Sequence, residues 1–210
     1  MTLLSRAGYE SVPLKIAATG SDHAAWPARP VVITFDDGTL DFWEHALPVL
    51  ERVGFTATLF VVTGYVGGRS SWDRDLGEPD RPLMSWDQIR RLHGQGFEFG
   101  SHTHNHRPLT ELSEEQARQE LTRSRQALED RLGVAPQFLA YPRGLYDDRH
   151  KRLARETGYA GACSVILHWR DLWRSERYEL KRMTIKGTES MLGFRLRLWL
   201  CRFVRQSASE

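Results

Sequence analysis

Cysteine is scarce in this 210-residue chain, which holds only Cys163 and Cys201. Two cysteines in apolar surroundings lack the spacing of a zinc site and the number needed for a disulfide framework, so we expect two buried thiols. Long apolar runs are also missing, because no window reaches the roughly 18 uninterrupted apolar residues of a membrane-spanning helix. Residues 1–14 show no secretory signal, which predicts a cytoplasmic location for the chain as it stands.

An excess of either charge is missing too. The chain has 29 Lys and Arg residues against 27 Asp and Glu, a net charge of +2, so the composition predicts no nucleic-acid partner. Hydrophobic residues make up 40% of the chain and charged residues 27%, which is ordinary for a globular protein. With this length, the composition predicts one folded domain over residues 1–210, and it says nothing of the oligomeric state.

Five short runs rich in β-branched and aromatic residues alternate with longer helical patterns. The runs that we expect to be strands are residues 31–35, 56–62, 97–101, 137–141 and 162–167. Ser85 with Gln88 and Ser113 with Gln116 have capping-box spacing, and the second helix should stop at Gly133. This alternation predicts an α/β protein with a parallel sheet, open or closed into a barrel, whose ligands bind beyond the carboxyl ends of the strands.

Two adjacent carboxylates, Asp36 and Asp37, directly follow the first expected strand, and Gly38 then lets the chain turn. Such residues after a strand often form a turn or a helix N-cap. The alternative is a functional site, since polar residues at the carboxyl ends of parallel strands line the ligand-binding edge of a sheet.

Three of the eight histidines lie within five residues, at His102, His104 and His106, just after the expected strand 97–101. A histidine pair four residues apart can reach one ion, and imidazole with a carboxylate suits Zn²⁺ or a related divalent metal. A solvated histidine-rich loop would not explain why the acidic pair and the histidines both follow strands of one sheet. We therefore predict one divalent ion, with zinc favoured and cobalt, nickel or manganese as alternatives.

Two histidines and one aspartate would leave a coordination position open for water, as in catalytic metal sites. A metal lowers the pKa of bound water, and a second carboxylate beside it can take the proton while the water attacks a carbonyl carbon. Asp36 is the carboxylate available for this role.

A third expected strand end is followed by Tyr141, Pro142, Arg143 and Gly144. Backbone N–H groups of this loop could hydrogen-bond a developing oxyanion, and the first donor after the proline is the Arg143 amide. An ordinary turn containing proline and glycine explains the same residues equally well.

In order and spacing, these three motifs resemble those of the polysaccharide deacetylases with NodB homology. The matching segments are residues 34–38 (Thr-Phe-Asp-Asp-Gly), residues 102–106 (His-Thr-x-x-His) and residues 141–144 (Tyr-Pro-Arg-Gly). With the segments that frame them, the resemblance covers about residues 30–190. It implies a distorted (β/α) barrel of about seven units and the hydrolysis of acetyl groups on sugars.

Carried over residue by residue, the resemblance makes Asp36 the catalytic base and Thr103 a support of the histidine loop. The metal ligands would be Asp37, His102 and His106. The Arg143 amide would form an oxyanion hole together with the metal, and Tyr141 and Pro142 would lie at the substrate.

The chain departs from the family pattern at several positions. Many relatives have an arginine that orients the base where this chain has Ala140, and an aromatic residue where it has Arg143. Arg143 could supply the missing positive charge to Asp36 or could contact an acidic substrate, and both alternatives remain open. Relatives also carry a late histidine as general acid; His168 is the candidate here, with a structural role as the alternative.

The start of the chain is a further departure, because relatives of this type usually have a strand before the segment that is residues 7–14 here. Either the barrel lacks its first strand or the true start lies upstream. The second case would reopen the question of a signal peptide and would fit a protein of the cell envelope.

Two peripheral features complete the predictions. Trp72 lies in the glycine-rich, charged segment 64–82, where its indole could stack on a sugar ring, although burial is the more common role of tryptophan. Residues 191–205 are apolar with four arginines, three of which fall on one face of a helix. Such a helix could lie on a membrane surface or cover the barrel with its apolar side.

The leading functional hypothesis is hydrolysis of acetyl groups, above all N-acetyl, from an amino-sugar oligo- or polysaccharide, with a metal-bound water as nucleophile. A second hypothesis is removal of acyl or formyl groups from a small or lipid-linked sugar amide on the same scaffold. A third is a carbohydrate-binding pseudoenzyme, which the altered third motif favours and the intact Asp36 opposes.

Overall fold

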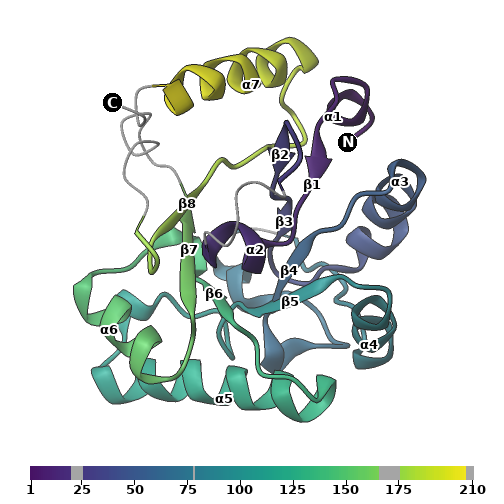
Figure 1. Ribbon diagram of the computed structural model, residues 1–210. Coiled ribbons are helices and arrows are strands. Elements are labelled where there is room, and N and C mark those ends of the chain that lie inside the picture. Colours follow the sequence, from purple (N-terminus) through teal and green to yellow (C-terminus); the bar gives the residue numbers. More distant parts are fainter. Residues whose placement is uncertain (20–25, 78, 166–175, 207–210) are drawn as a thin grey trace.

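A parallel sheet of six strands forms the centre of the protein (Figure 1). The computed structural model describes residues 1–19, 26–77, 79–165 and 176–206. The strands of the sheet are β3 (Thr34–Phe35), β4 (Thr58–Val61), β5 (Glu98–Ser101), β6 (Phe138–Ala140), β7 (Gly161–Val165) and β8 (Leu180–Arg182). All neighbours are parallel, and their order in the sheet is their order in the chain. The sheet curls into a half-barrel, which confirms the predicted α/β class and the distorted (β/α) barrel.

Some strands differ from the prediction. Residues 31–35 form two short strands instead of one, because β2 (Pro30–Val31) pairs with β1 (Glu10–Ser11) outside the main sheet. No sequence pattern indicates β8, since its three residues include two charged side chains and form no apolar run. The last residues of the expected strand 162–167 lie outside the described part of the chain.

Helices flank the strands, and α3 to α6 lie along the outer side of the sheet (Figure 1). The helices are α1 (Thr2–Arg6), α2 (Leu14–Thr19), α3 (Leu47–Val53), α4 (Trp86–Gly94), α5 (Glu114–Leu132), α6 (Asp148–Glu156) and α7 (Met191–Gln206). Both predicted capping boxes are present, with Ser85 accepting from Gln88 and Ser113 from Gln116. The φ of Gly133 is 73°, the left-handed end that glycine favours, so the predicted stop of α5 is confirmed.

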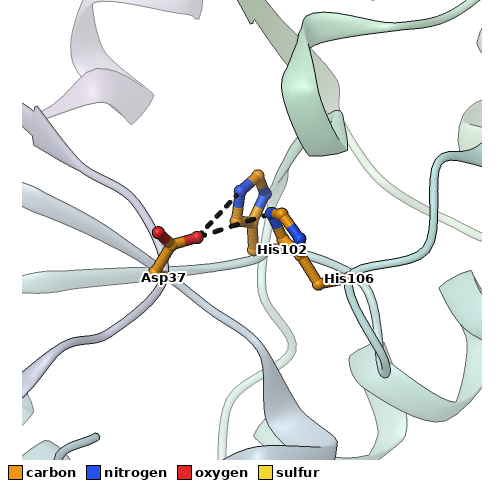
Figure 2. A group of neighbouring side chains, drawn as sticks. All are labelled: Asp37, His102 and His106. Carbon is orange, nitrogen blue, oxygen red and sulfur yellow. Dashed lines mark ion pairs between the residues drawn. The ribbon is translucent and has the colours of Figure 1, made fainter. Parts of the chain in front are cut away.

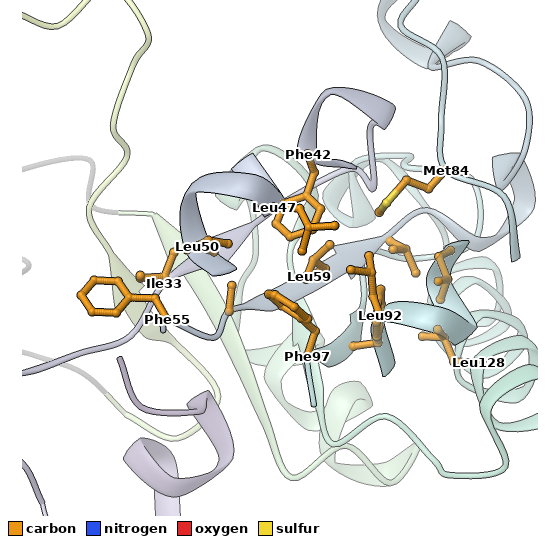
Figure 3. Close-up of a cluster of buried hydrophobic side chains, with 14 of the residues drawn as sticks. Ile33, Phe42, Leu47, Leu50, Phe55, Leu59, Met84, Leu92, Phe97 and Leu128 are labelled. Atoms are coloured by element: carbon orange, nitrogen blue, oxygen red, sulfur yellow. The ribbon is translucent and has the colours of Figure 1, made fainter. Parts of the chain in front are cut away.

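Apolar side chains fill the space between the sheet and helices α3 to α5 (Figure 3). Leu50 of α3, Leu92 of α4 and Leu128 of α5 pack in one cluster with Leu59 of β4. These four leucines are at most 1% exposed. Truncating such a side chain to alanine typically costs about 2–5 kcal/mol, so this core holds the strand ends firmly in place.

The barrel is open on one side. β3 and β8 are the two edges of the sheet, and within the described residues no backbone pairing joins them. A cavity of about 1020 Å³ lies between these edges and helices α1 and α7, with Ile33, Leu180 and Phe194 among its lining residues. Residues of helices α1 and α7 thus line this open side.

Candidate functional site

Three side chains that follow two different strands meet at one point (Figure 2). Oδ1 of Asp37 lies 3.5 Å from Nε2 of His102 and 3.5 Å from Nε2 of His106. One donor atom from each residue lies within 4.8 Å of the other two, and the histidine rings have centroids 4.7 Å apart. A carboxylate oxygen with two imidazole nitrogens is a ligand set for zinc or a related ion, so the residues fit the predicted metal.

Hydrogen bonds to the backbone of neighbouring segments fix the orientation of His102. The residue directly follows β5, its backbone N–H donates to the Val61 carbonyl at 2.9 Å, and it is 3% exposed. Its Nδ1 lies 2.8 Å from the carbonyl oxygen of Ala140, which can only accept, so we assign the hydrogen to Nδ1. When the ring is neutral, this tautomer leaves the lone pair of Nε2 facing Asp37, which is the arrangement that binds a metal.

The three motifs contain unusual backbone conformations. The non-glycine residues with positive φ in the described chain are Asp37 (70°), Thr103 (63°), His106 (58°) and Arg143 (56°). Such a conformation costs about 1–3 kcal/mol per residue and persists only where the surroundings enforce it. All four residues belong to the predicted site, so the fold stores its backbone strain there.

Two hydrogen bonds enforce the turn that carries His106. Oγ1 of Thr103 accepts from the backbone N–H of His106 at 3.0 Å, and Ser101 Oγ accepts from the backbone N–H of Thr103 at 3.1 Å. The first of these bonds closes the turn from inside. This geometry suits the supporting role that the resemblance implies for Thr103.

Glu120 of α5, which the sequence analysis does not single out, holds the other side of the same turn. It is 7% exposed, and its Oε2 accepts from the backbone N–H groups of His104 at 3.0 Å and Asn105 at 2.7 Å. Its Oε1 accepts from Nδ2 of Asn105 at 2.6 Å, while the His104 ring bonds with Thr63 Oγ1 at 3.0 Å. The available signal was an acidic residue beside Leu121, on the apolar face of an amphipathic helix.

Asp36, the neighbour of Asp37 in the sequence, has a different partner. Arg182 of β8 donates to both of its oxygens, from Nη1 to Oδ1 at 2.6 Å and from Nη2 to Oδ2 at 2.8 Å. Nη1 also donates to Oγ1 of Thr34 at 3.0 Å, so the guanidinium group bridges the edge strands β3 and β8. Arg182 therefore provides a charge beside Asp36, so this role does not require Arg143.

The charges of this pair are stabilised on both sides. Burial raises the pKa of Asp36, but the charge and hydrogen bonds of Arg182, with contributions from His102 and His106, outweigh burial and lower the pKa below its usual value. Burial lowers the pKa of Arg182, and Asp36 more than offsets this. Asp36 is thus an ionised carboxylate, able to accept a proton.

The third motif follows the strand whose Ala140 carbonyl anchors His102. Tyr141 is 1% exposed, its hydroxyl donates to the Tyr178 carbonyl at 3.0 Å, and burial raises its pKa. Pro142 is also buried, which leaves Arg143 as the exposed residue of the motif. Contact of Tyr141 or Pro142 with a substrate stays a prediction, and their burial does not favour it.

Trp72 lies directly against His106, one of the candidate metal ligands. Its ring centroid is 4.8 Å from that of His106, with an interplanar angle of 36°, and 5.2 Å from that of Tyr65. The indole therefore forms a wall beside a candidate ligand, where a sugar ring could reach it. His168, the candidate general acid, lies outside the described residues.

The family model for polysaccharide deacetylases matches residues 24–162, which is more than half of the chain. The chain belongs to this family. The match spans the three motifs and ends before β8, so Arg182 lies beyond it.

A curated relative of this chain is the poly-beta-1,6-N-acetyl-D-glucosamine N-deacetylase of Staphylococcus aureus (strain MSSA476). The two are 28% identical over 142 residues, which cover 63% of this chain and 47% of the relative. The chain spans about half the length of the curated relatives it matches.

Two solved structures share the fold of this chain. IcaB from Ammonifex degensii superposes with a TM-score of 0.74 at 22% identity, over 94% of this chain and 84% of that one. The Streptococcus pyogenes deacetylase PplD, in complex with acetate, gives a TM-score of 0.73 at 23% identity, over 92% and 81%. At these identities the likeness establishes the fold alone.

Proposed function

We propose that this protein is a metal-dependent hydrolase that removes N-acetyl groups from an amino-sugar-containing oligo- or polysaccharide. The observation that carries the proposal is the Asp37, His102 and His106 cluster next to the ionised Asp36. The Staphylococcus aureus relative, whose name gives poly-N-acetylglucosamine as its substrate, supports this substrate class.

Asp37, His102 and His106 would hold the ion, and we propose zinc because one carboxylate and two imidazoles suit it well. A divalent ion in such a site polarises a carbonyl oxygen and acidifies water. The hydrogen bond from His102 to Ala140 would keep that ligand in the required tautomer.

The other groups of the chain would handle protons and charge. Asp36 would accept a proton from a water molecule while the oxygen of that water bonds to the acetyl carbon. Arg182 would hold the carboxylate in place. The backbone N–H of Arg143 would donate to the oxyanion. The C–N bond then breaks, acetate leaves, and the sugar nitrogen takes up a proton, for which His168 is our proposed donor.

Metal content and acetate release, measured together, test this proposal. Protein purified without an affinity tag should contain one divalent ion per chain, and it should release acetate from partly acetylated glucosamine oligosaccharides. A chelator should stop the release, and zinc or cobalt should restore it. Asp36→Asn should keep the metal and lose the release, because it removes only the proton acceptor.

Each other outcome has a definite meaning. Metal binding without acetate release from any acetylated sugar would overturn the N-acetyl substrate and favour a formyl substrate or a binding role. Failure to bind metal under every loading condition would overturn the assignment of the three ligands.

A further inference from the structure

Helix α7 covers the open side of the barrel with one of its faces (Figure 1). Phe194 and Leu198 are partly buried and pack against the main core cluster. Phe194 and Met191 also line the cavity between β3 and β8. This inward face is the arrangement expected of a terminal helix that shields a barrel.

A second apolar face of the same helix points away from the protein. Of the eight large hydrophobic residues that are exposed in the described chain, five are found from Ile185 to Trp199, and two of these, Ile185 and Met191, also line the cavity. On α7 itself, Leu192 is 79% exposed, Leu196 55% and Trp199 52%. We call Leu192, Leu196 and Trp199 the outward face of α7. Exposed apolar residues gathered in this way usually mark an interaction surface.

Helical geometry shows that the two faces are distinct. At about 100° per residue, Leu192, Leu196 and Trp199 fall within an arc of about 60°. The direction of Phe194 and Leu198 is about 150° away from the centre of that arc. One helix thus presents apolar side chains on two nearly opposite sides, of which the inward one packs against the core.

The charges on α7 indicate what the outward face binds. The helix contains four arginines and no acidic residue. Arg195 is exposed and falls about 40° beyond Trp199, at the border of the outward face. Arg197 is on the other side of this face and pairs with Glu189 at 2.7 Å. A second copy of α7 would bring arginines against arginines, so an acidic surface is the better partner.

We infer that the outward face of α7 docks the protein onto an anionic lipid surface. Leucine and tryptophan side chains would enter the boundary between headgroups and acyl chains, while Arg195 would remain among the acidic headgroups. None of the helices in the described residues combines the length and apolar character needed to cross a membrane. The inference does not depend on the proposed deacetylase activity.

Vesicle co-sedimentation with the full chain tests this inference. The chain should bind vesicles of phosphatidylcholine with phosphatidylglycerol and should bind pure phosphatidylcholine much more weakly, with binding to the first falling as salt rises. The double variant Leu192→Gln/Leu196→Gln should lose about a hundredfold or more in partition coefficient, because two leucines no longer leave water. Arg195→Gln should lose about fivefold.

Matched controls separate docking from general damage. Val134 is 51% exposed at the far end of α5, so Val134→Gln changes an exposed apolar residue elsewhere and should leave binding unchanged. Arg123→Gln, on the exposed side of α5, is the corresponding control for charge. Circular dichroism should show that all variants are folded.

Two results would overturn the inference. One is vesicle binding that is absent, or that is equal in the double variant and the Val134→Gln control. The other is a dimer in the absence of lipid that the double variant makes monomeric, since the outward face would then be an interface between two copies of this chain.

Discussion

Asp36 and Asp37 are neighbours in the chain but belong to two differently built halves of the site. Asp37 faces His102 and His106, which sit on a turn that follows the central strand β5. Asp36 faces Arg182, 146 residues further along, across the open side of the barrel. The first half is held by the core of the protein, and the second by one ion pair between two edge strands.

The two halves should therefore fail in different ways. The turn with the histidines is held by hydrogen bonds from its backbone N–H groups to the side-chain oxygens of Thr103, Ser101 and Glu120, so several changes would be needed to displace it. Within the described part of the chain, the charged hydrogen bonds to the Asp36 carboxylate come from Arg182 alone. We expect metal binding and proton transfer to be separable by mutation, and the predictions below test that separation.

His102→Ala should have the largest effect, because it removes a ligand of the proposed ion. Metal content should fall below one ion per two chains, and acetate release should fall by more than the about 10–100-fold that is typical when a supporting residue is lost. Elemental analysis and an acetate assay measure the two effects. His45→Ala, which removes an exposed histidine from the helical turn before α3, should change neither. Full metal content in His102→Ala would show that the cluster is not the metal site.

Arg182→Met should leave the metal in place and lower kcat by about 10–100-fold, because the proton acceptor loses its two charged hydrogen bonds. Arg182 lowers the pKa of Asp36 in the intact protein, so its removal raises that pKa. Since Asp36 must be ionised to accept a proton, activity is lost as pH falls through its pKa. The acidic limb of the profile of kcat against pH should therefore move to higher pH.

Arg182→Lys tests the geometry of the same pair. Lysine keeps the charge but cannot make two parallel bonds, so the acidic limb should move less than in Arg182→Met while kcat recovers only in part. Arg118→Met, which breaks the exposed ion pair with Glu156 on the outer helices, should leave the pH profile unchanged. If the acidic limb does not move in Arg182→Met, then either Asp36 is not the proton acceptor or Arg182 does not set its pKa.

The difference between the halves also explains what the sequence could predict. The half of the site around Asp37 is encoded locally. Each of its motifs directly follows a strand, and the spacing of the two histidines indicates a pair of metal ligands. The helices are likewise marked by capping boxes and by Gly133. These features could be read because residues close in the chain determine them.

Arg182 could not be predicted for the opposite reason. It belongs to a strand of three residues without an apolar run, and its partner lies 146 residues earlier. Many relatives have an arginine where this chain has Ala140. That the arginine comes from β8 here can be seen only once the curl of the sheet is known. Glu120 is an intermediate case, because its place on the apolar face of α5 was visible but its partners were not.

Glu120→Ala should destabilise the turn that carries the histidines without removing a proposed metal ligand. Three donors of the His104 and Asn105 segment would lose their acceptor, and leaving a buried donor unsatisfied costs about 1–3 kcal/mol. We expect a lower thermal unfolding midpoint and about tenfold weaker zinc binding by competitive titration. Glu120→Gln keeps one oxygen, so its unfolding midpoint and zinc affinity should lie between those of Glu120→Ala and the wild type. Glu115→Ala, at an exposed position of the same helix, should have values near those of the wild type. Unchanged zinc affinity in Glu120→Ala would show that the short-range bonds of Thr103 suffice.

Trp72→Ala should have the smallest effect. It tests whether the indole beside His106 contacts the substrate or supports the histidine ligand. If the indole stacks on a sugar ring, KM should rise by about three- to tenfold with kcat nearly unchanged, since an aromatic contact is worth about 0.5–1.5 kcal/mol. Trp72→Phe should recover most of the loss. Trp86→Phe, in a tryptophan that packs on the core and under Arg131, should leave KM unchanged. A fall in kcat or in zinc affinity at constant KM would instead mean that Trp72 acts through the His106 ring, 4.8 Å away.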